Sequence, residues 1–273
     1  MRSQLATLSV LCLFLSLAAC QKEKPVPAPA AVAEPPAPAP VVVQPFLPLK
    51  VEKLQWSRQQ PGCKVGKPAK SSRNKESSKA CATAKADFLR FPDNPELSAL
   101  LEKQLVTLAA GDTLSPASAT VSDYADHYLK KAGRQYEAVF KATLLRQAGP
   151  LVLLKLEVYE FTGGANGAAS TRYLNYDRAG KRQLLLDDVV IDGQRPALSA
   201  KLRAAHAAWN AQQGLGGDWA FQETDNFALD TDGLRFKYAA YAIAPRVLGE
   251  PEFLLPYAEL AGVLRPEWIL QAP

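Results

Sequence analysis

"LVLLKLEVYEFTGGANGAASTRYLNYD", residues 151–177, contains two strand-like runs on either side of a loop with three glycines in five residues. In the first run, apolar side chains occupy alternate positions and polar ones lie between them, which predicts a strand with one buried face. The apolar positions are Val152, Leu154, Leu156 and Val158. Strands joined by such a short loop pair antiparallel, so this stretch predicts the centre of an antiparallel sheet.

Further strands and helices are expected on both sides of this pair. The other expected strands are Val51–Trp56, Thr83–Phe91, Tyr136–Leu145, Gln183–Leu186, Phe227–Leu229, Leu234–Ala242 and Phe253–Pro256. Asn94-Pro95-Glu96 has the cap and first-turn proline of a helix start, and leucines follow at helical spacing. Other helices are expected from Ser122 to near Gly133, burying Tyr124 and Tyr128, and from near Pro196. The expected fold class is α+β: an antiparallel sheet packed by helices, in two intertwined modules that meet near Phe161.

The glycine loop does not fit a phosphate-binding loop. Such a loop precedes a helix whose amide groups face the anion, and it usually ends in Lys-Ser or Lys-Thr. Here Gly167 is followed by Ala-Ala-Ser-Thr-Arg-Tyr, which predicts a strand. The glycines therefore indicate positive φ or close backbone approach, and no nucleotide cofactor is expected.

The first residues resemble a bacterial lipoprotein signal. Arg2 precedes the apolar run Leu5–Leu17, which is too short for a stable membrane-spanning helix. Leu17-Ala18-Ala19-Cys20 then matches a lipobox, so we expect a signal peptide at residues 1–19 and lipidation of Cys20. A simple secretory leader with a chance cysteine is the alternative. Gln21 is not the aspartate of inner-membrane retention, which favours the outer membrane, facing the periplasm.

Residues 20–49 predict a tether. Nine prolines lie between Gln21 and Leu49, and such a composition favours extended, semi-rigid chain. A merely disordered tail is the alternative. The folded part then begins at residue 50, with modules predicted at residues 50–160 and 161–273.

Two of the four cysteines remain once Cys12 leaves with the signal peptide and Cys20 is lipidated. In an oxidising periplasm, Cys63 and Cys81 are expected to pair, contributing about 3 kcal/mol on the chain-entropy estimate. Their spacing excludes a CxxC redox site, and no zinc ligands lie nearby.

Charge is unevenly distributed. Residues 21–150 contain 19 Lys and Arg against 12 Asp and Glu, a net of +7, whereas residues 151–273 contain 12 against 15, a net of −3. The loop between the paired cysteines is the most basic part, which suits either contact with anionic envelope polymer or simple solvation. Nucleic acid is not an expected partner of an exported protein.

Catalytic motifs are sparse. The two histidines, His127 and His206, lie far apart, and the chain has no GxSxG motif and no metal-ligand cluster. Asp187 and Asp188 are adjacent, so on a strand they point to opposite faces, and capping the following turn is their expected role. A glycosidase with a carboxylate pair that meets only in the folded protein is the open alternative.

Several segments, in order, resemble the RsiV-like domain of bacterial envelope proteins. They are FTGGANG (161–167), YLNYD (173–177), LLLDDV (184–189), FALDTDGLRF (227–236), YAIAP (241–245), Gly249 and PYAEL (256–260). Residues 51–161 resemble the module that commonly precedes it and also occurs in a peptidoglycan deacetylase. The family usually has histidine where Asn166 stands, so a role that needs an imidazole is not implied here.

The resemblance implies a binding protein. Some members sense lysozyme and signal through a membrane helix, whereas this chain is expected to have a lipid anchor in place of that helix. We predict a non-catalytic, periplasm-facing lipoprotein that binds peptidoglycan or a lysozyme-like hydrolase, without metal or cofactor; a hydrolase of envelope glycan is the alternative, and a structural component without a ligand is a third. The predicted binding surface comprises Gly163, Gly164, Asn166, Gly167, Tyr173, Tyr241 and Pro245.

Overall fold

The computed structural model describes residues 46–64, 80–110, 120–215 and 219–269. The predicted signal peptide, the lipidated Cys20 and nearly all of the tether lie outside these residues. All of the described residues belong to one compact unit, residues 44–273.

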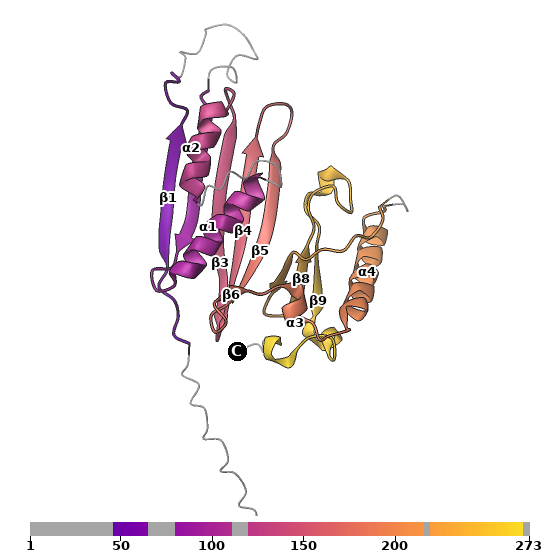
Figure 1. Cartoon of the computed structure of the whole chain (residues 1–273). Helices are drawn as coiled ribbons and strands as arrows, with labels where there is room; N and C mark the ends of the chain where they lie inside the picture. The colour runs from indigo at the N-terminus through magenta and orange to yellow at the C-terminus, as the bar shows by residue number, and fades with distance from the viewer. Residues whose placement is uncertain (1–45, 65–79, 111–119, 216–218, 270–273) are drawn as a thin grey trace, which may run out of the picture. The chain divides into compact units, whose positions relative to one another are not determined.

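Two sheets and four helices make up the described fold, which confirms the α+β prediction (Figure 1). The larger sheet has the order β1-β2-β3-β4-β5-β6, with β1 Glu52–Gln59, β2 Thr83–Arg90, β3 Glu137–Ala148, β4 Leu151–Phe161, β5 Ala168–Asp177 and β6 Arg182–Gln183. The smaller sheet contains β7 Phe227–Leu229, β8 Gly233–Lys237 and β9 Glu252–Pro256. The helices are α1 Pro95–Ala110, α2 Val121–Lys131, α3 Leu186–Val189 and α4 Arg195–Gln212.

One strand pair departs from the antiparallel expectation. β2 and β3 run parallel, with Thr83 opposite Glu137. The chain between them forms α1 and α2, and this long connection returns it to the same end of the sheet. The other pairs of the larger sheet, β3–β4 and β4–β5 among them, are antiparallel.

Helices α1 and α2 cover one face of the larger sheet (Figure 1). The cap of α1 is as predicted, because Asn94 Oδ1 accepts a hydrogen bond of 2.9 Å from the Leu97 backbone. Leucines of α1 pack against the predicted apolar face of β4. Fully buried members of this layer include Leu97, Leu101, Leu105, Val152, Leu154 and Leu156. The same alternation leaves polar residues on the opposite face, where Lys155 and Glu157 form an ion pair of 2.7 Å.

The smaller sheet packs with α4 and α3 around a second apolar core. α4 contributes Leu198, Leu202 and His206, which are spaced four residues apart. His206 is buried, with its ring near Phe221 and Phe253, so it is a packing residue of this core.

Several boundaries differ from those predicted. β8 ends at Lys237 rather than Ala242, because the chain turns there and Tyr241 has a positive φ of 71°. The one-turn helix α3 begins at Leu186, where a strand was expected to end. The predicted module boundary near residue 161 falls between β4 and β5, which pair with each other, so the larger sheet spans it.

The predicted disulfide is confirmed: Cys63 and Cys81 are bonded.

Candidate functional site

The glycine loop joins β4 to β5 and is exposed along most of its length. Gly163 and Gly164 have φ of 91° and 92°, a conformation that other residues rarely adopt. Gly167 differs from them, because its lack of a side chain leaves space for the ring of Tyr159, which a Cβ there would displace. The loop thus meets both expectations, positive φ and close approach, and each of its ends borders a separate cavity.

The first cavity, here called the tyrosine pocket, lies between α2 and the start of the loop. It is lined by Tyr124, His127, Tyr128, Lys131, Ala132, Tyr136 and Thr162 and has a volume of about 140 Å³. The rings of Tyr124 and Tyr128 are 6.4 Å apart and nearly parallel, at 17°. Most of the lining is apolar ring surface, while His127 and Lys131 are exposed at its rim.

Glu160 lies beside this pocket and binds one of its tyrosines. The Tyr124 hydroxyl donates to Glu160 Oε1 at 2.9 Å, and the Tyr128 hydroxyl donates to the Phe161 carbonyl at 3.3 Å. Burial raises the pKa of Glu160, and the hydrogen bond from Tyr124 only partly offsets this. Burial and the nearby carboxylate also raise the pKa of both tyrosines. Both phenols therefore stay neutral. Tyr124 is only 6% exposed, so the half-buried rings of Tyr128 and Tyr136 supply the accessible ring surface of the pocket.

The second cavity, here called the edge groove, lies at the other end of the loop. Its volume is about 680 Å³, and it is lined by residues 166–170 together with Ala239, Ala240, Arg246, Val247, Gly249 and Glu250. One wall is thus the start of β5, and the other is the segment between β8 and β9. Asn166 and Gly167, both in the predicted binding surface, line this groove.

The other residues of the predicted surface lie elsewhere. Gly163 and Gly164 are exposed between the two cavities, Tyr241 is 64% exposed, and Pro245 is half-buried. Tyr173 is not on an exposed rim: it is only 6% exposed, and its hydroxyl donates to Glu252 Oε2 at 2.7 Å. Position 173 alternates toward the smaller sheet, so its ring fills the contact between the sheets.

Carboxylates meet in three dimensions at the surface around Arg195, which contacts Asp187 and Asp225, and in a less exposed place around Arg235. The Arg235 guanidinium donates to Asp230 and to Glu252, each at 2.8 Å. Burial raises the pKa of both carboxyls, but hydrogen bonds outweigh it, from Thr231 and Arg235 to Asp230 and from Tyr173 and Arg235 to Glu252. Both pKa values are therefore lowered, and both groups are ionised at neutral pH. A glycosidase pair needs one carboxyl that stays protonated, so this cluster does not fit acid–base catalysis.

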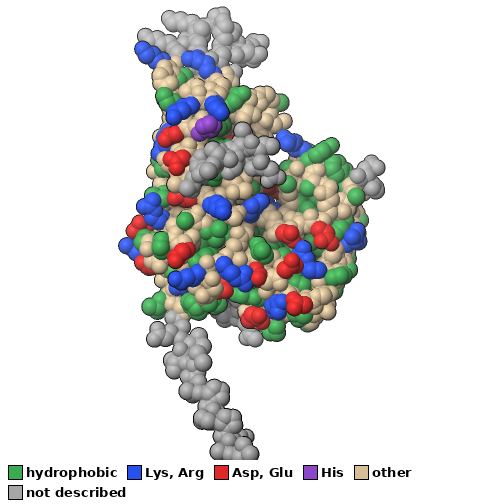
Figure 2. Space-filling model, viewed as in Figure 1, with side chains coloured by type: hydrophobic (Ala, Val, Ile, Leu, Met, Phe, Trp, Pro, Cys, Tyr) green, Lys and Arg blue, Asp and Glu red, His purple; other side chains and the backbone are tan. Residues whose placement is uncertain are grey.

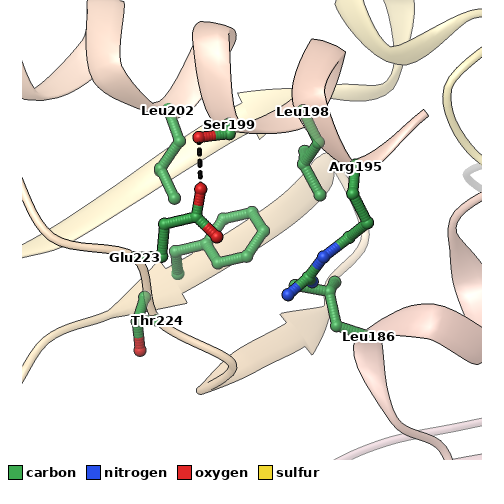
Figure 3. A pocket seen from close by; sticks show the side chains of 8 residues that line it. Leu186, Arg195, Leu198, Ser199, Leu202, Glu223 and Thr224 are labelled. Carbon is green, nitrogen blue, oxygen red and sulfur yellow. Dashed lines mark hydrogen bonds between the residues drawn. The ribbon is translucent and has the colours of Figure 1, made fainter. Parts of the chain in front are cut away.

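A small pocket between α4 and β8 is also unsuited to a substrate (Figure 3). The Ser199 hydroxyl there donates to Glu223 at 2.5 Å, and Arg195 points toward the same space. The cavity volume is about 10 Å³, which is room for about one water molecule.

The described residues contain neither a metal-binding cluster nor a membrane-spanning helix. No group of three or more His, Cys, Asp or Glu side chains there is placed to hold a metal ion. Within the described part of the chain, no helix is long and apolar enough to cross a bilayer.

Comparison with known proteins supplies a family. A crystal structure of a DUF3298 family protein from Pseudomonas aeruginosa PAO1 is 31% identical, with a TM-score of 0.70, over 83% of this chain and 98% of that one. The chain belongs to the DUF3298 family. Residues 187–258 also match the sequence model of that family, which is described as "Protein of unknown function (DUF3298)". A DUF3298 family structure from Bacteroides fragilis NCTC 9343, 20% identical with a TM-score of 0.61 over 81% and 96% of the two chains, shares the fold. No curated protein matches.

Membership of the DUF3298 family covers part of the resemblance drawn from the sequence. The finer likeness to the RsiV-like domain and to a deacetylase module stays a prediction. The sequence of this DUF3298 protein predicted Tyr124 and Tyr128 on the buried face of a helix. It did not predict the pocket that they line beside the glycine loop, because that pocket depends on how α2 crosses the sheet.

Proposed function

We propose that this DUF3298 protein is a non-catalytic, lipid-anchored protein of the cell envelope that binds the glycan of peptidoglycan at the tyrosine pocket. The observation that carries this proposal is a pocket beside the exposed glycine loop, in which the rings of Tyr128 and Tyr136 are half-buried and the buried ring of Tyr124 lies behind them. Sugar rings have apolar faces that stack on aromatic side chains, and their hydroxyl groups bind nearby polar groups.

The size and charge of the pocket support a glycan ligand. Its 140 Å³ is below the range of about 300–1,000 Å³ for drug-sized ligands, so it suits one sugar residue of a longer chain. Lys130 and Lys131 are exposed at the end of α2, and Figure 2 shows Lys and Arg side chains near a histidine at this end of the molecule. This charge complements the carboxylates of peptidoglycan and opposes a strongly basic lysozyme.

The cellular address in this proposal rests on the sequence. The lipobox ending at Cys20 and the proline-rich tether support anchoring to the outer membrane, with the folded part in the periplasm. Fractionation of cells should find the wild-type protein with outer membranes and the Cys20→Ser variant released from them. A soluble wild-type protein would contradict this address.

Binding is tested with purified peptidoglycan, using residues 44–273, which form one compact unit. We expect co-sedimentation of the wild-type unit with peptidoglycan, and about tenfold weaker binding by Tyr136→Ala, which removes one wall of the pocket. Tyr159→Ala is the matched control, because Tyr159 is partly exposed but lies outside the pocket.

Three outcomes would overturn the proposal. The first is equal binding by wild type and Tyr136→Ala. The second is capture by immobilised lysozyme without any binding to peptidoglycan. The third is release of new reducing ends from peptidoglycan by the wild-type unit, which would show a hydrolase.

A further inference from the structure

The outer edge of β5 is closed along only part of its length. On one side β5 pairs with β4 from Ala168 to Asp177. On the other side, β6 pairs only with Tyr176 and Asp177. The rest of that edge is left for other groups to satisfy.

Two side chains from later in the sequence, Asn226 and Glu250, close the middle of this edge. Asn226 takes the place of a neighbouring strand: its Oδ1 accepts from the Tyr173 backbone at 2.9 Å, and its Nδ2 donates to the Thr171 carbonyl at 2.8 Å. Glu250 accepts from the Thr171 backbone at 2.9 Å and from the Thr171 hydroxyl at 2.6 Å. The N–H and C=O groups of the odd-numbered residues of β5 therefore point away from β4, toward this edge.

By the same alternation, the N–H and C=O of Ala169 also point outward. No described residue binds either group, and Ala169 lines the edge groove. An open strand edge of this kind is a template on which another chain pairs.

The walls of the groove leave room for such a chain. Residues 168–170 have small side chains, and Ala239 and Ala240 face them across the groove. Val247 is 89% exposed on this wall, so its side chain is accessible to an apolar group of a segment that lies in the groove. Arg246 has no acidic partner among the described residues, and Glu250 is already bound to Thr171.

We propose that the edge groove binds an extended segment of a partner protein, which pairs with β5 at Ala169. The segment packs an apolar side chain on Val247 and places a carboxylate beside Arg246. This site is distinct from the tyrosine pocket, although both border the glycine loop. Its chemistry also differs, because it uses backbone pairing rather than stacking on rings.

The probe is a random library of linear heptapeptides, displayed on phage and selected on residues 44–273. We expect enrichment of peptides that combine β-branched residues with Asp or Glu. Synthetic copies should lose affinity when alternate backbone nitrogens are methylated, because the hydrogen bonds to β5 are then removed.

Variants of the protein locate the binding. Ala169→Pro removes the backbone N–H that points into the groove and leaves the hydrogen bonds between β4 and β5 in place. It should weaken peptide binding about tenfold. Val247→Glu and Arg246→Glu should also weaken it, and both residues are exposed, so folding is unaffected. Lys53→Glu on β1, at the opposite edge of the sheet, is the charge control and should bind as wild type.

Three results would overturn this inference. One is a selection that enriches no peptide. Another is a set of enriched peptides that binds Ala169→Pro and Val247→Glu as tightly as wild type. The third is a dimer of residues 44–273 in sedimentation that Ala169→Pro dissociates, which would make a second copy the occupant. None of these results affects binding to peptidoglycan, so the two proposals fail separately.

Discussion

Two buried contacts hold this protein together in different ways. The layer between the larger sheet and helices α1 and α2 is built from apolar side chains such as Leu101 and Leu154. The contact between β5 and the smaller sheet adds hydrogen bonds of Asn175, Asn226 and Glu252 to a small apolar cluster. The first contact is stabilised by removal of apolar surface from water, and the second by pairing of polar groups that would otherwise be buried alone.

The difference bears on where function resides. An apolar layer tolerates small shifts, whereas each hydrogen bond across the polar contact has one specific partner. Hydrogen bonds of Asn175, Asn226 and Glu250 hold the smaller sheet and its flanking segments against β5. These bonds set how much of the β5 edge stays open. The polar contact therefore determines the geometry of the edge groove.

The largest effect is expected in the apolar layer. Leu154 is fully buried, so Leu154→Ala should lower the free energy of unfolding by about 3 kcal/mol through lost burial and a residual cavity. Urea denaturation measures this. Leu145→Ala on β3, where the side chain is 46% exposed, is the control and should change stability by less than about 0.5 kcal/mol. Equal effects of the two substitutions would contradict the assignment of this layer as the main core.

A substitution in the polar contact between β5 and the smaller sheet should lower the free energy of unfolding by less than Leu154→Ala does. Asn175 is 2% exposed, its amide donates to the Phe227 carbonyl at 2.8 Å, and its Oδ1 accepts from the Leu229 backbone at 2.9 Å. Asn175→Ala leaves both backbone groups without partners, which should lower the free energy of unfolding by about 2 kcal/mol. It should also weaken peptide binding at the edge groove, whereas the exposed Asn166→Ala should leave stability unchanged. An Asn175→Ala variant as stable as wild type would show that water replaces these bonds.

The same contrast explains what the sequence revealed. The alternation in β4 and the leucine spacing of α1 report burial directly, so the apolar layer, the helix cap and the antiparallel strands were predictable. The parallel β2–β3 pair was not, because local periodicity does not record how a helical connection returns the chain. The polar contact was not either: Asn175, Asn226 and Glu250 resemble surface residues, and their partners lie more than 50 residues away in sequence.

The candidate site was predictable only in part for a related reason. The glycines marked the loop, and their conformations follow from residue type. Which aromatic residues border the loop depends on tertiary packing. Tyr173 was expected at the rim but lies inside the polar contact, whereas Tyr136 comes from a segment that the sequence assigned only to a strand.

The smallest effects should distinguish two glutamates, one in each region. Burial raises the pKa of Glu252, but hydrogen bonds from Tyr173 and Arg235 and the charge of Lys237 outweigh it, so its pKa is lowered. Burial raises the pKa of Glu160, and the hydrogen bond from Tyr124 does not compensate. A lowered carboxyl pKa contributes stability above the ordinary value of about 4.3, which is lost as the pH falls through the folded-state pKa. A raised pKa contributes stability only at lower pH, and this is lost as the pH rises through the folded-state pKa.

Opposite signs are therefore expected for the same substitution. At pH 7, Glu252→Gln should lower the free energy of unfolding by about 1 kcal/mol, because it removes the charge that Arg235 and Lys237 bind. Glu160→Gln should raise it by about 0.5 kcal/mol, since the amide still accepts from Tyr124 but carries no buried charge. The Glu160 difference should shrink first, as the pH falls through the raised pKa of that carboxyl toward about 4.3. The Glu252 difference should shrink only below about pH 4.3, as the pH falls toward its lowered pKa. Urea denaturation of the three proteins between pH 3 and pH 8 measures this. If Glu160→Gln is destabilising at pH 7, then water or a bound cation solvates that carboxylate, and the tyrosine pocket is more polar at its base than its ring-lined walls indicate.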